Sequence, residues 1–538
     1  MKIRALFICL VIFKSSFAQT WQDTLLTIDK AFSQYHPKKP GCQLSVSRNG
    51  QIIFSKAWGM ADLERKVSLS INSIFEAGSV SKQFTAASIL LLQQQGKLSI
   101  DDNVRKYIPE LPDYGTPITL RQMLHHTSGL RDWGSLSELT GWPRGKKFYT
   151  NDDALEIIVR QKHLNNKPGD EYLYSNSNYT LLTIIVKRVS GMELASFTRK
   201  YIFEPAGMTN TQWRDDPNRI VLNRAIAYSK SDSIFVTEMP NEYVYGHGGL
   251  LTTTEDLLKW TDFYQKGKLG TSSLLARQTQ TDPLNNGVIN TYAAGLSVSQ
   301  VRGWKNISHS GATASYRAYL ETFPELDLSI AILSNTSQFN IVNMETKIRN
   351  IFVPEKTEKA TKKETGVDLS DAQLNSFVGL YKNERDGSTF ELSVKDKKII
   401  LDNDLSMFAV ADNIVKSNNF QLNVNGSKGW YIPYSPRDTI PFTKVSPAKL
   451  SQKDLAVYQG KYFSEETNST LTIQRKNDTL IIQLKPAADY PLIPTYTDAF
   501  KIDDLGCDLE FTRSPKQKIT GIKMNLSRAR NVAFKKIE

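Results

Sequence analysis

Motifs for metal ions, disulfides and nucleic acid are missing from this sequence of 538 residues. It has six histidines and three cysteines, with no H-E-x-x-H and no cysteine–histidine spacing typical of zinc sites. Cys42 and Cys507 lie far apart, so we expect buried free thiols and no disulfide framework. The formal net charge is +12, yet no arginine-rich helix or aromatic-interleaved basic strand favours nucleic acid. We therefore expect no metal, no other cofactor and no nucleic-acid partner.

Long apolar runs are also missing after the first 18 residues. Lys2 and Arg4 precede the apolar stretch Ala5 to Phe13, and Ser16-Phe17-Ala18 is a small-x-small cleavage site before Gln19. This pattern predicts a signal peptide over residues 1–18. No later segment approaches the ~18 continuous apolar residues of a membrane span, so we expect no transmembrane anchor after cleavage. The sequence therefore predicts a periplasmic or secreted protein.

A serine and a lysine three residues apart are the most informative feature present. Ser79-Val80-Ser81-Lys82 opens a run from Val80 to Gln95 that has helical apolar spacing and no Gly or Pro. Residues i and i+3 share one face of a helix, so Lys82 can hydrogen-bond the Ser79 hydroxyl. A neutral lysine can take the serine proton, and the helix N-terminus stabilises negative charge beside it. The pair predicts a nucleophile and its base.

Two further motifs follow in the order that such a nucleophile needs. Tyr174-Ser175-Asn176 lies in a loop just ahead of an apolar helical run. His309-Ser310-Gly311 opens a segment that the sequence predicts to be an edge strand, from His309 to Phe323. A tyrosine beside the serine can relay a proton, and a passing strand can offer a backbone N–H to an oxyanion. Gly311 lets a substrate approach that backbone closely.

The combined motifs S-x-x-K, Y-x-N and H-x-G resemble those of the serine β-lactamase and penicillin-binding-protein superfamily. The resemblance is closest to its class C-like branch, which contains D-alanyl-D-alanine carboxypeptidases, D-aminopeptidases and esterases. It covers roughly residues 20–350 and includes four more segments: Phe75-Glu76-Ala77-Gly78, Gly96-Lys97-Leu98-Ser99-Ile100-Asp101-Asp102, Leu124-His125-His126-Thr127-Ser128-Gly129-Leu130 and Gly246-His247-Gly248-Gly249-Leu250.

The resemblance implies a role for each motif residue. Ser79 would be the acyl-accepting nucleophile and Lys82 its base. Tyr174 would relay the proton, and Asn176 would position Lys82 and the substrate amide. The oxyanion hole would be the N–H of Ser79 and that of Ala312, the residue after the H-x-G glycine.

His309 departs from many relatives, which have lysine at this position. A histidine is mostly neutral at pH 7 unless a carboxylate raises its pKa. The departure resembles the D-aminopeptidase and esterase members, and it puts in doubt tight binding of substrates that end in a free carboxylate. His309 could also be a plain strand residue without a ligand role.

Three other histidines also have more than one interpretation. His125 and His126 follow a helix with the capping box Thr119 and Gln122, which favours packing or C-terminal capping over catalysis. His247 lies among three glycines, either as a loop residue or as part of the cleft.

Helical and strand patterns over residues 19–352 predict an α+β domain, the plan of the β-lactamase/transpeptidase fold. An antiparallel sheet from both ends of the domain would lie beside a helical region. The expected helices are 21–34, several within 79–189, 253–264 and 343–351, and the expected strands are 42–47, 51–58 and segments of 309–334.

The C-terminal part consists of a charged linker over residues 353–369 and two repeats, 370–449 and 450–538. Leu374, Phe377, Gly379 and Tyr381 recur 81 residues later as Leu455, Tyr458, Gly460 and Tyr462. Short alternating strands with Gly, Asn and Asp turns predict one small barrel per repeat. A single lipocalin-like barrel built from both halves is the alternative.

Taken together, the residues predict an exported serine hydrolase that works through an acyl-enzyme. Its substrate would be a small molecule or peptide with an amide or ester bond, most readily a D-amino-acid peptide derived from peptidoglycan. The nearest alternatives are a β-lactamase and a small-ester esterase. A penicillin-binding or sensor protein that is acylated without turnover is the alternative from another class. The oligomeric state is not determined by the sequence.

Overall fold

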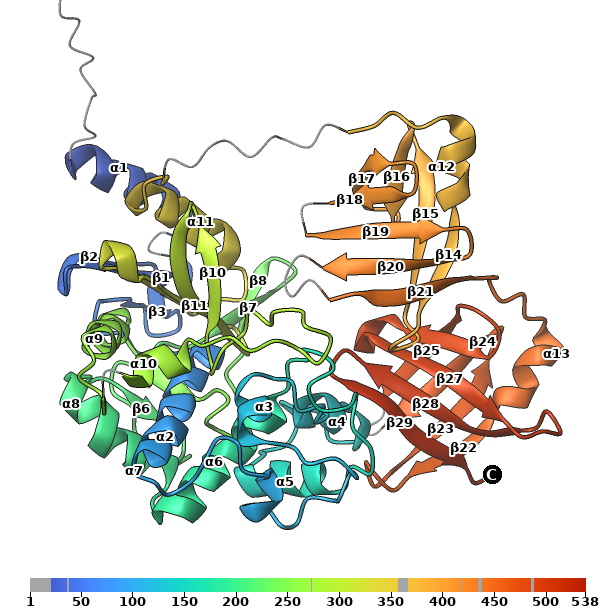
Figure 1. Cartoon of the computed structure of the whole chain (residues 1–538), viewed down its shortest axis with the longest axis horizontal. Helices are drawn as coiled ribbons and strands as arrows, with labels where there is room; N and C mark the ends of the chain where they lie inside the picture. The colour runs from blue at the N-terminus through green and yellow to red at the C-terminus, as the bar shows by residue number, and fades with distance from the viewer. Residues whose placement is uncertain are drawn as a thin grey trace, which may run out of the picture.

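The computed structural model describes residues 21–35, 38–271, 273–356, 366–417, 419–433, 438–484 and 488–538. The expected signal peptide therefore lies outside the described residues. The chain forms an N-terminal α+β domain and two closed β-barrels that lie beside it, one above the other in Figure 1. Within the described ranges, no helix combines the length and apolar character required to cross a membrane.

A six-stranded antiparallel sheet organises the N-terminal domain, with strands from both ends of the domain at its centre. The strand order is β10 (Ser297–Val301), β11 (Trp304–Thr313), β12 (Tyr316–Phe323), β13 (Leu328–Ser334), β1 (Cys42–Arg48) and β2 (Gln51–Trp58). Helices α1 (Trp21–Phe32) and α11 (Ile341–Phe352) share an apolar core with β1 and β13. Helix α9 (Thr254–Gln265) packs against the same two strands. This is the predicted α+β architecture.

The helical region surrounds α2 (Lys82–Gln94), whose residues are buried from Lys82 to Leu92. Such a helix is enclosed on all sides, not amphipathic, because α6, α7 and α10 all contact it. The other helices are α3 (Leu120–Leu124), α4 (Trp133–Leu139), α5 (Asn151–Val159), α6 (Asn176–Ser190), α7 (Leu194–Thr198), α8 (Glu204–Ala206) and α10 (Ser273–Gln278). Short strands join them: β3 (Met60–Asp62), β4 (Val67–Ser68), β5 (Phe75–Glu76), β6 (Gln212–Trp213), β7 (Tyr228–Ser231), β8 (Ile234–Thr237) and β9 (Leu250–Thr252).

The edge strand predicted from His309 to Phe323 is wrong in two respects. The segment is the end of β11 and the whole of β12, joined by a turn at which Ala314 has a φ of 44°. Strand β11 also has a neighbour on its other side, since β10 pairs with it from Trp304 to Ser308. That pairing stops just before His309, so the half of β11 with the H-x-G motif runs beyond β10.

The two barrels repeat one plan, which confirms tandem barrels and excludes the single combined barrel. The first contains β14 (Gly379–Asn383), β15 (Thr389–Lys395), β16 (Lys398–Leu401), β17 (Leu405–Ala411), β18 (Ile414–Lys416), β19 (Phe420–Asn425), β20 (Lys428–Pro433) and β21 (Ile440–Val445). The second contains β22 (Gly460–Ser464), β23 (Ser469–Lys476), β24 (Thr479–Leu484), β25 (Ala488–Pro494), β26 (Ala499–Ile502), β27 (Cys507–Arg513), β28 (Ile519–Leu526) and β29 (Ala529–Lys536).

Equivalent residues hold the start of each barrel. A capped helix precedes each first strand, α12 (Asp371–Phe377) in one and α13 (Gln452–Leu455) in the other. The Tyr381 hydroxyl donates to the Phe377 carbonyl at 2.7 Å, and Tyr462 donates to Tyr458 at the same distance. The 81-residue sequence repeat is therefore also a structural repeat.

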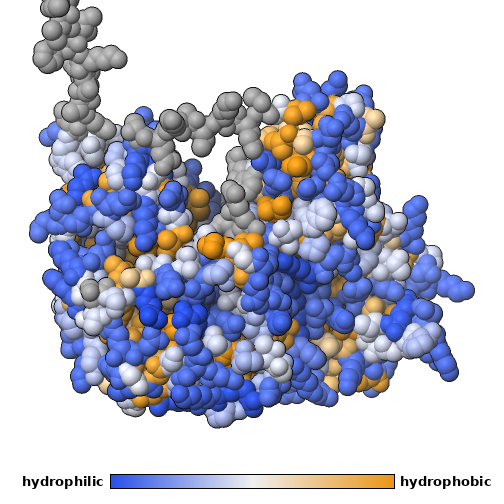
Figure 2. Space-filling view, in the orientation of Figure 1, coloured by the Kyte–Doolittle hydropathy of each residue, from blue (hydrophilic) through white to orange (hydrophobic). Residues whose placement is uncertain are grey.

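The barrels differ in how they join the N-terminal domain. The second barrel shares one continuous apolar core with that domain, whereas the first encloses a core of its own. The first barrel also has a visible apolar patch over β16 to β18 (Figure 2), and Leu405 and Phe408 of β17 are exposed. Of the expected linker, residues 357–365 lie outside the described part; Lys356 just before them forms an ion pair with Glu325 at 3.0 Å.

The cysteines agree with the sequence analysis. Cys42 and Cys507 are free and buried, and burial raises the pKa of both thiols. Neither is therefore activated as a nucleophile.

Candidate active site

Ser79 lies in a tight 3₁₀ turn, Gly78–Ser81, that leads directly into α2. The helix predicted from Val80 thus begins at Lys82, just two residues later. Gly78 has a φ of +50°, and a Cβ there would lie 2.7 Å from the Ala312 nitrogen. A Cβ on Gly311 would lie 2.0 Å from the Ala77 carbonyl oxygen and 3.1 Å from the Ser79 nitrogen. The two glycines therefore let β11 pass directly against the nucleophile turn, with the Ser79 and Ala312 nitrogens at the same contact.

Lys82 is completely buried one turn after Ser79, and three oxygens surround its amine. The Nζ–Oγ distance to Ser79 is 3.1 Å; Nζ donates to Asn176 Oδ1 at 2.9 Å and to the His247 carbonyl at 2.6 Å. Burial holds the pKa of Lys82 well below its usual range, and the guanidinium of Arg528 lowers it further. A neutral amine has two N–H groups and one lone pair. The Asn176 side-chain oxygen and the His247 carbonyl accept hydrogen bonds from the two N–H groups. The lone pair therefore remains available to take the Ser79 proton.

Tyr174 lies against both members of this pair. Lys82 Nζ is 4.7 Å from the centre of the Tyr174 ring. Burial raises the pKa of Tyr174, and the Ser79 hydroxyl beside it opposes that rise. The phenol therefore retains its proton at neutral pH. Its hydroxyl is buried near Ser79 without a hydrogen-bond partner of its own among the described residues, so it is free to relay a proton.

His126 supports Tyr174 from behind, a role that the sequence analysis did not identify. The two ring centres are 4.2 Å apart, and Nδ1 of His126 accepts the Ser175 N–H at 3.2 Å. Burial lowers the pKa of His126, so the ring is neutral. His125, by contrast, is the C-cap of α3, as predicted. The signal for His126 was the Leu124-to-Leu130 segment, which the resemblance had already included.

His309 is buried on β11 and neutral. Nδ1 donates to the Ser310 carbonyl at 2.6 Å, so Nε2 accepts the Tyr292 hydroxyl at 2.8 Å. Burial lowers the pKa of His309 to about 4, and the nearby Lys82 contributes in the same direction. His309 therefore supplies no fixed positive charge at neutral pH.

A cleft of about 600 Å³ opens over these residues, and every predicted site residue except Lys82 lines it. Lys82 is buried beneath the cleft, in contact with Ser79. Among the described residues, three arginines and no Asp or Glu line the cleft. The lining is Ser79, Arg144, Tyr172, Tyr174, Asn176, His247, Gly248, Tyr292, Ser297, His309, Ser310, Gly311, Ala312, Thr313, Arg317, Ile341 and Arg528. His247, left open by the sequence, is both a wall of the cleft and an acceptor for Lys82.

Arg528 belongs to the second barrel, in the turn between β28 and β29. Its guanidinium lies 4.8 Å from the centre of the Tyr174 ring, on the cleft side. Arg144 pairs with Glu242, and Arg317 donates to two carbonyls, but Arg528 has no ion pair within the described ranges. The second barrel thus contributes a wall and a cation to the site. No local motif in the sequence marked this residue.

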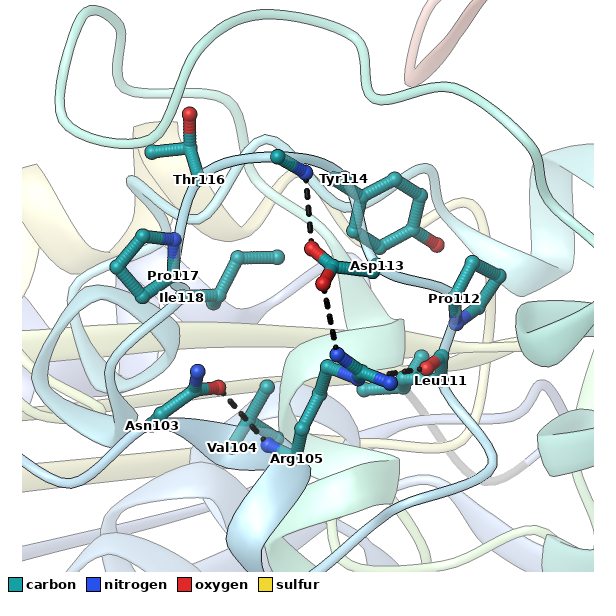
Figure 3. Close-up of a pocket in the computed structure, with 11 residues that line it drawn as sticks. Asn103, Val104, Arg105, Leu111, Pro112, Asp113, Tyr114, Thr116, Pro117 and Ile118 are labelled. Carbon is teal, nitrogen blue, oxygen red and sulfur yellow. Dashed lines mark hydrogen bonds and ion pairs between the residues drawn. The ribbon is translucent and has the colours of Figure 1, made fainter.

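A second cavity, of about 390 Å³, lies between residues 103 and 118 (Figure 3). Its charged groups are already paired. Arg105 bonds Asp113 at 3.1 Å and the Leu111 carbonyl at 3.0 Å, and Asp113 also accepts the Gly115 N–H at 2.9 Å. These contacts close a loop and pair both charged side chains of the cavity with each other and with the backbone.

Comparison with known proteins gives a consistent result. A model of the Beta-lactamase family matches residues 28–350. Penicillin-binding protein 4* of Bacillus subtilis is 29% identical over 393 residues, which are 66% of this chain and 82% of that protein. A D-aminopeptidase of Cereibacter sphaeroides is 29% identical over 297 residues, 55% of this chain and 57% of that protein. The chain thus spans little more than half the length of that D-aminopeptidase.

A solved structure agrees in fold. The octameric penicillin-binding protein homologue from Pyrococcus abyssi superposes with a TM-score of 0.54 at 20% identity, over 87% of this chain and 98% of that one. The family match covers more than half of the sequence and contains all three motifs. The chain therefore belongs to the Beta-lactamase family, as the motifs predicted.

Proposed function

We propose that this protein is an exported serine hydrolase that cleaves D-amino-acid peptides through an acyl-enzyme on Ser79. The observation that carries the proposal is the buried Lys82 amine, which has acceptors for both N–H groups and its lone pair beside Ser79 Oγ. Export rests on the leader pattern of residues 1–18.

Acylation then follows from the positions of the groups. Lys82 takes the Ser79 proton as Oγ attacks the substrate carbonyl carbon. The N–H groups of Ser79 and Ala312 receive the negative charge that develops on the carbonyl oxygen. The C–N bond breaks as Tyr174 passes a proton to the leaving nitrogen and regains one from Lys82. Water then cleaves the ester on Ser79, releasing the acid and restoring the hydroxyl.

The charge of the cleft favours a substrate that ends in a free carboxylate. The described lining contains Arg144, Arg317 and Arg528 but no acidic side chain; because Arg144 is paired with Glu242, the uncompensated positive charge of the cleft comes from Arg317 and Arg528. Arg528 supplies the cation that the neutral His309 does not. This favours a D-Ala carboxypeptidase type of activity over a D-aminopeptidase type.

The test is a substrate panel assayed with wild type and Ser79→Ala. It contains a D-Ala-D-Ala peptide, its C-terminal amide, D-alanine p-nitroanilide, p-nitrophenyl butyrate and nitrocefin. We expect the free-carboxylate peptide to have the highest kcat/KM and the mutant to be inactive on all. Preference for the p-nitroanilide would indicate an aminopeptidase, and preference for nitrocefin a β-lactamase. A burst without steady state on every substrate would indicate a sensor.

A further inference from the structure

Asp132 lies between the Leu124-to-Leu130 segment and helix α4, close to Lys82, the predicted base. It is buried, and its Oδ1 accepts the Ser135 N–H at 2.9 Å as the N-cap of α4. Its Oδ2 accepts the Asn176 N–H at 2.6 Å. Asn176 in turn accepts Lys82 Nζ at 2.9 Å on its side-chain oxygen. The Asp132 carboxylate is thus one residue removed from the amine of Lys82.

The second barrel holds the same segment in place. The Asp132 N–H donates to the Arg528 carbonyl at 3.0 Å. The neighbouring Arg131 is fully buried, pairs with Glu466 at 2.8 Å and donates to the Asn531 carbonyl at 3.0 Å. Residues 131–132 are therefore fixed to the barrel by their backbone and by a buried ion pair. The Arg528 side chain meanwhile extends into the cleft over Tyr174.

We propose that Asp132 and Arg528 are opposed positioning residues, which set the orientation and the charge of Lys82 from the domain and from the barrel. The proposal rests on the function proposed above. It assigns the second barrel a part in the catalytic step itself, beyond forming a wall of the cleft.

The electrostatics around Lys82 support this division of roles. The titratable groups that face it are Asp132, Arg144, Arg528, His126, His247, His309, Tyr174 and Tyr179. Burial is the largest cause of the lowered pKa of Lys82, followed by Arg528; Asp132 is the acidic group that raises it. Arg528 therefore helps to keep the resting amine neutral. Asp132 stabilises the ammonium that forms once Lys82 has taken the serine proton.

Two substitutions should move the pH dependence in opposite directions. Asp132→Asn keeps the Oδ1 acceptor but removes the negative charge, so the pKa of Lys82 falls and the acid limb of kcat/KM moves to lower pH. Its kcat should also fall, on the order of 10–10²-fold, because Asn176 loses its acceptor. Arg528→Met removes a positive charge, so the acid limb moves to higher pH. The double variant should lie between them.

The assay uses the uncharged ester p-nitrophenyl butyrate, so that binding of a substrate carboxylate to Arg528 does not contribute. Arg530→Met is the matched control, because Arg530 lies in β29, just two residues after Arg528, but pairs with Glu171 at 2.9 Å, outside the cleft lining. It should leave the acid limb at the wild-type pH. Melting temperatures identify variants whose folding is impaired.

The outcomes separate the two proposals. The rate at which a fluorophosphonate labels Ser79 gives the same pH profile without turnover. If wild type is not labelled at any pH, the proposed function fails. If wild type is labelled but the acid limbs of Asp132→Asn and Arg528→Met lie at the same pH as the wild-type limb, the proposed function stands and the positioning proposal is wrong. If both variants lose the same factor of activity at every pH, with no shift of the acid limb, the two residues have only structural roles and the positioning proposal is likewise wrong.

Discussion

The buried pair Arg131–Glu466 makes a prediction about stability that does not depend on any substrate. Glu466 belongs to the second barrel, and its Oε1 lies 2.8 Å from Arg131 Nη1 across the boundary with the N-terminal domain. The two side chains are 0% and 5% exposed. Burial lowers the pKa of Arg131, and Glu466 opposes this. Glu466→Met therefore leaves a buried guanidinium without its counter-charge.

Removing one partner of a buried pair typically costs about 3–5 kcal/mol. Glu466 Oε1 also accepts the Lys162 N–H at 2.8 Å, so the loss should fall toward the upper part of this range. For domains of this size, about 1 kcal/mol changes Tm by roughly 2–4 °C, so Tm should fall on the order of 10 °C. Differential scanning calorimetry measures this change.

A double-mutant cycle provides the control. Arg131→Met/Glu466→Met removes both charges and replaces them with apolar groups of similar volume, so it should recover most of the lost stability. The exposed pair Lys162–Glu465 spans the same boundary, with side chains 59% and 56% exposed, and Glu465→Met should change Tm little. If Glu466→Met unfolds at the wild-type temperature, the boundary is not closed in solution and the reasoning fails.

Four substitutions test the site. Ser79→Ala should abolish hydrolysis, a loss on the order of 10⁶-fold, with Tm nearly unchanged because the side chain is small; measurable turnover would remove Ser79 from the mechanism. Tyr174→Phe should lose on the order of 10²–10⁴-fold in kcat, as proton relay requires the hydroxyl. Gly311→Ala should inactivate the enzyme, since its Cβ would lie 2.0 Å from the Ala77 oxygen; normal kcat with wild-type Tm would contradict the close contact. His309→Lys should raise the ratio of kcat/KM for a D-Ala-D-Ala peptide over its C-terminal amide, and the gain should shrink with salt. An unchanged ratio would refute it.

The sequence predicted the parts of the site that are defined by local spacing. Ser79 and Lys82 meet because they are one helical turn apart, and Asn176 begins the helix that packs against that turn. The edge strand was wrong because alternation along one segment does not reveal which strands flank it. The turn at Ala314 also has no glycine or asparagine to mark it.

Residues that act across the domain boundary could not be predicted in this way. Arg528 is an ordinary hairpin residue in its own barrel, and Asp132 an ordinary N-cap in its own helix. Arg528 acquires its role through the docking of the second barrel, and Asp132 through its contact with Asn176, which is 44 residues away in the sequence. Because the second barrel shares its apolar core with the N-terminal domain, a fragment that ends at residue 352 would expose the apolar face and the charge of Arg131.

The position of Arg528 in the chain also orders events during synthesis. Ser79, Lys82, Tyr174 and His309 all precede it, and Arg528 comes 449 residues after Ser79. A ribosome adds about 5–20 residues per second, so roughly 20–90 s separate the nucleophile from the arginine that faces it. A nascent chain therefore carries every motif long before the cleft has its last wall. A product whose translation stops within the second barrel before Arg528 has the complete family signature but lacks the arginine that closes the cleft.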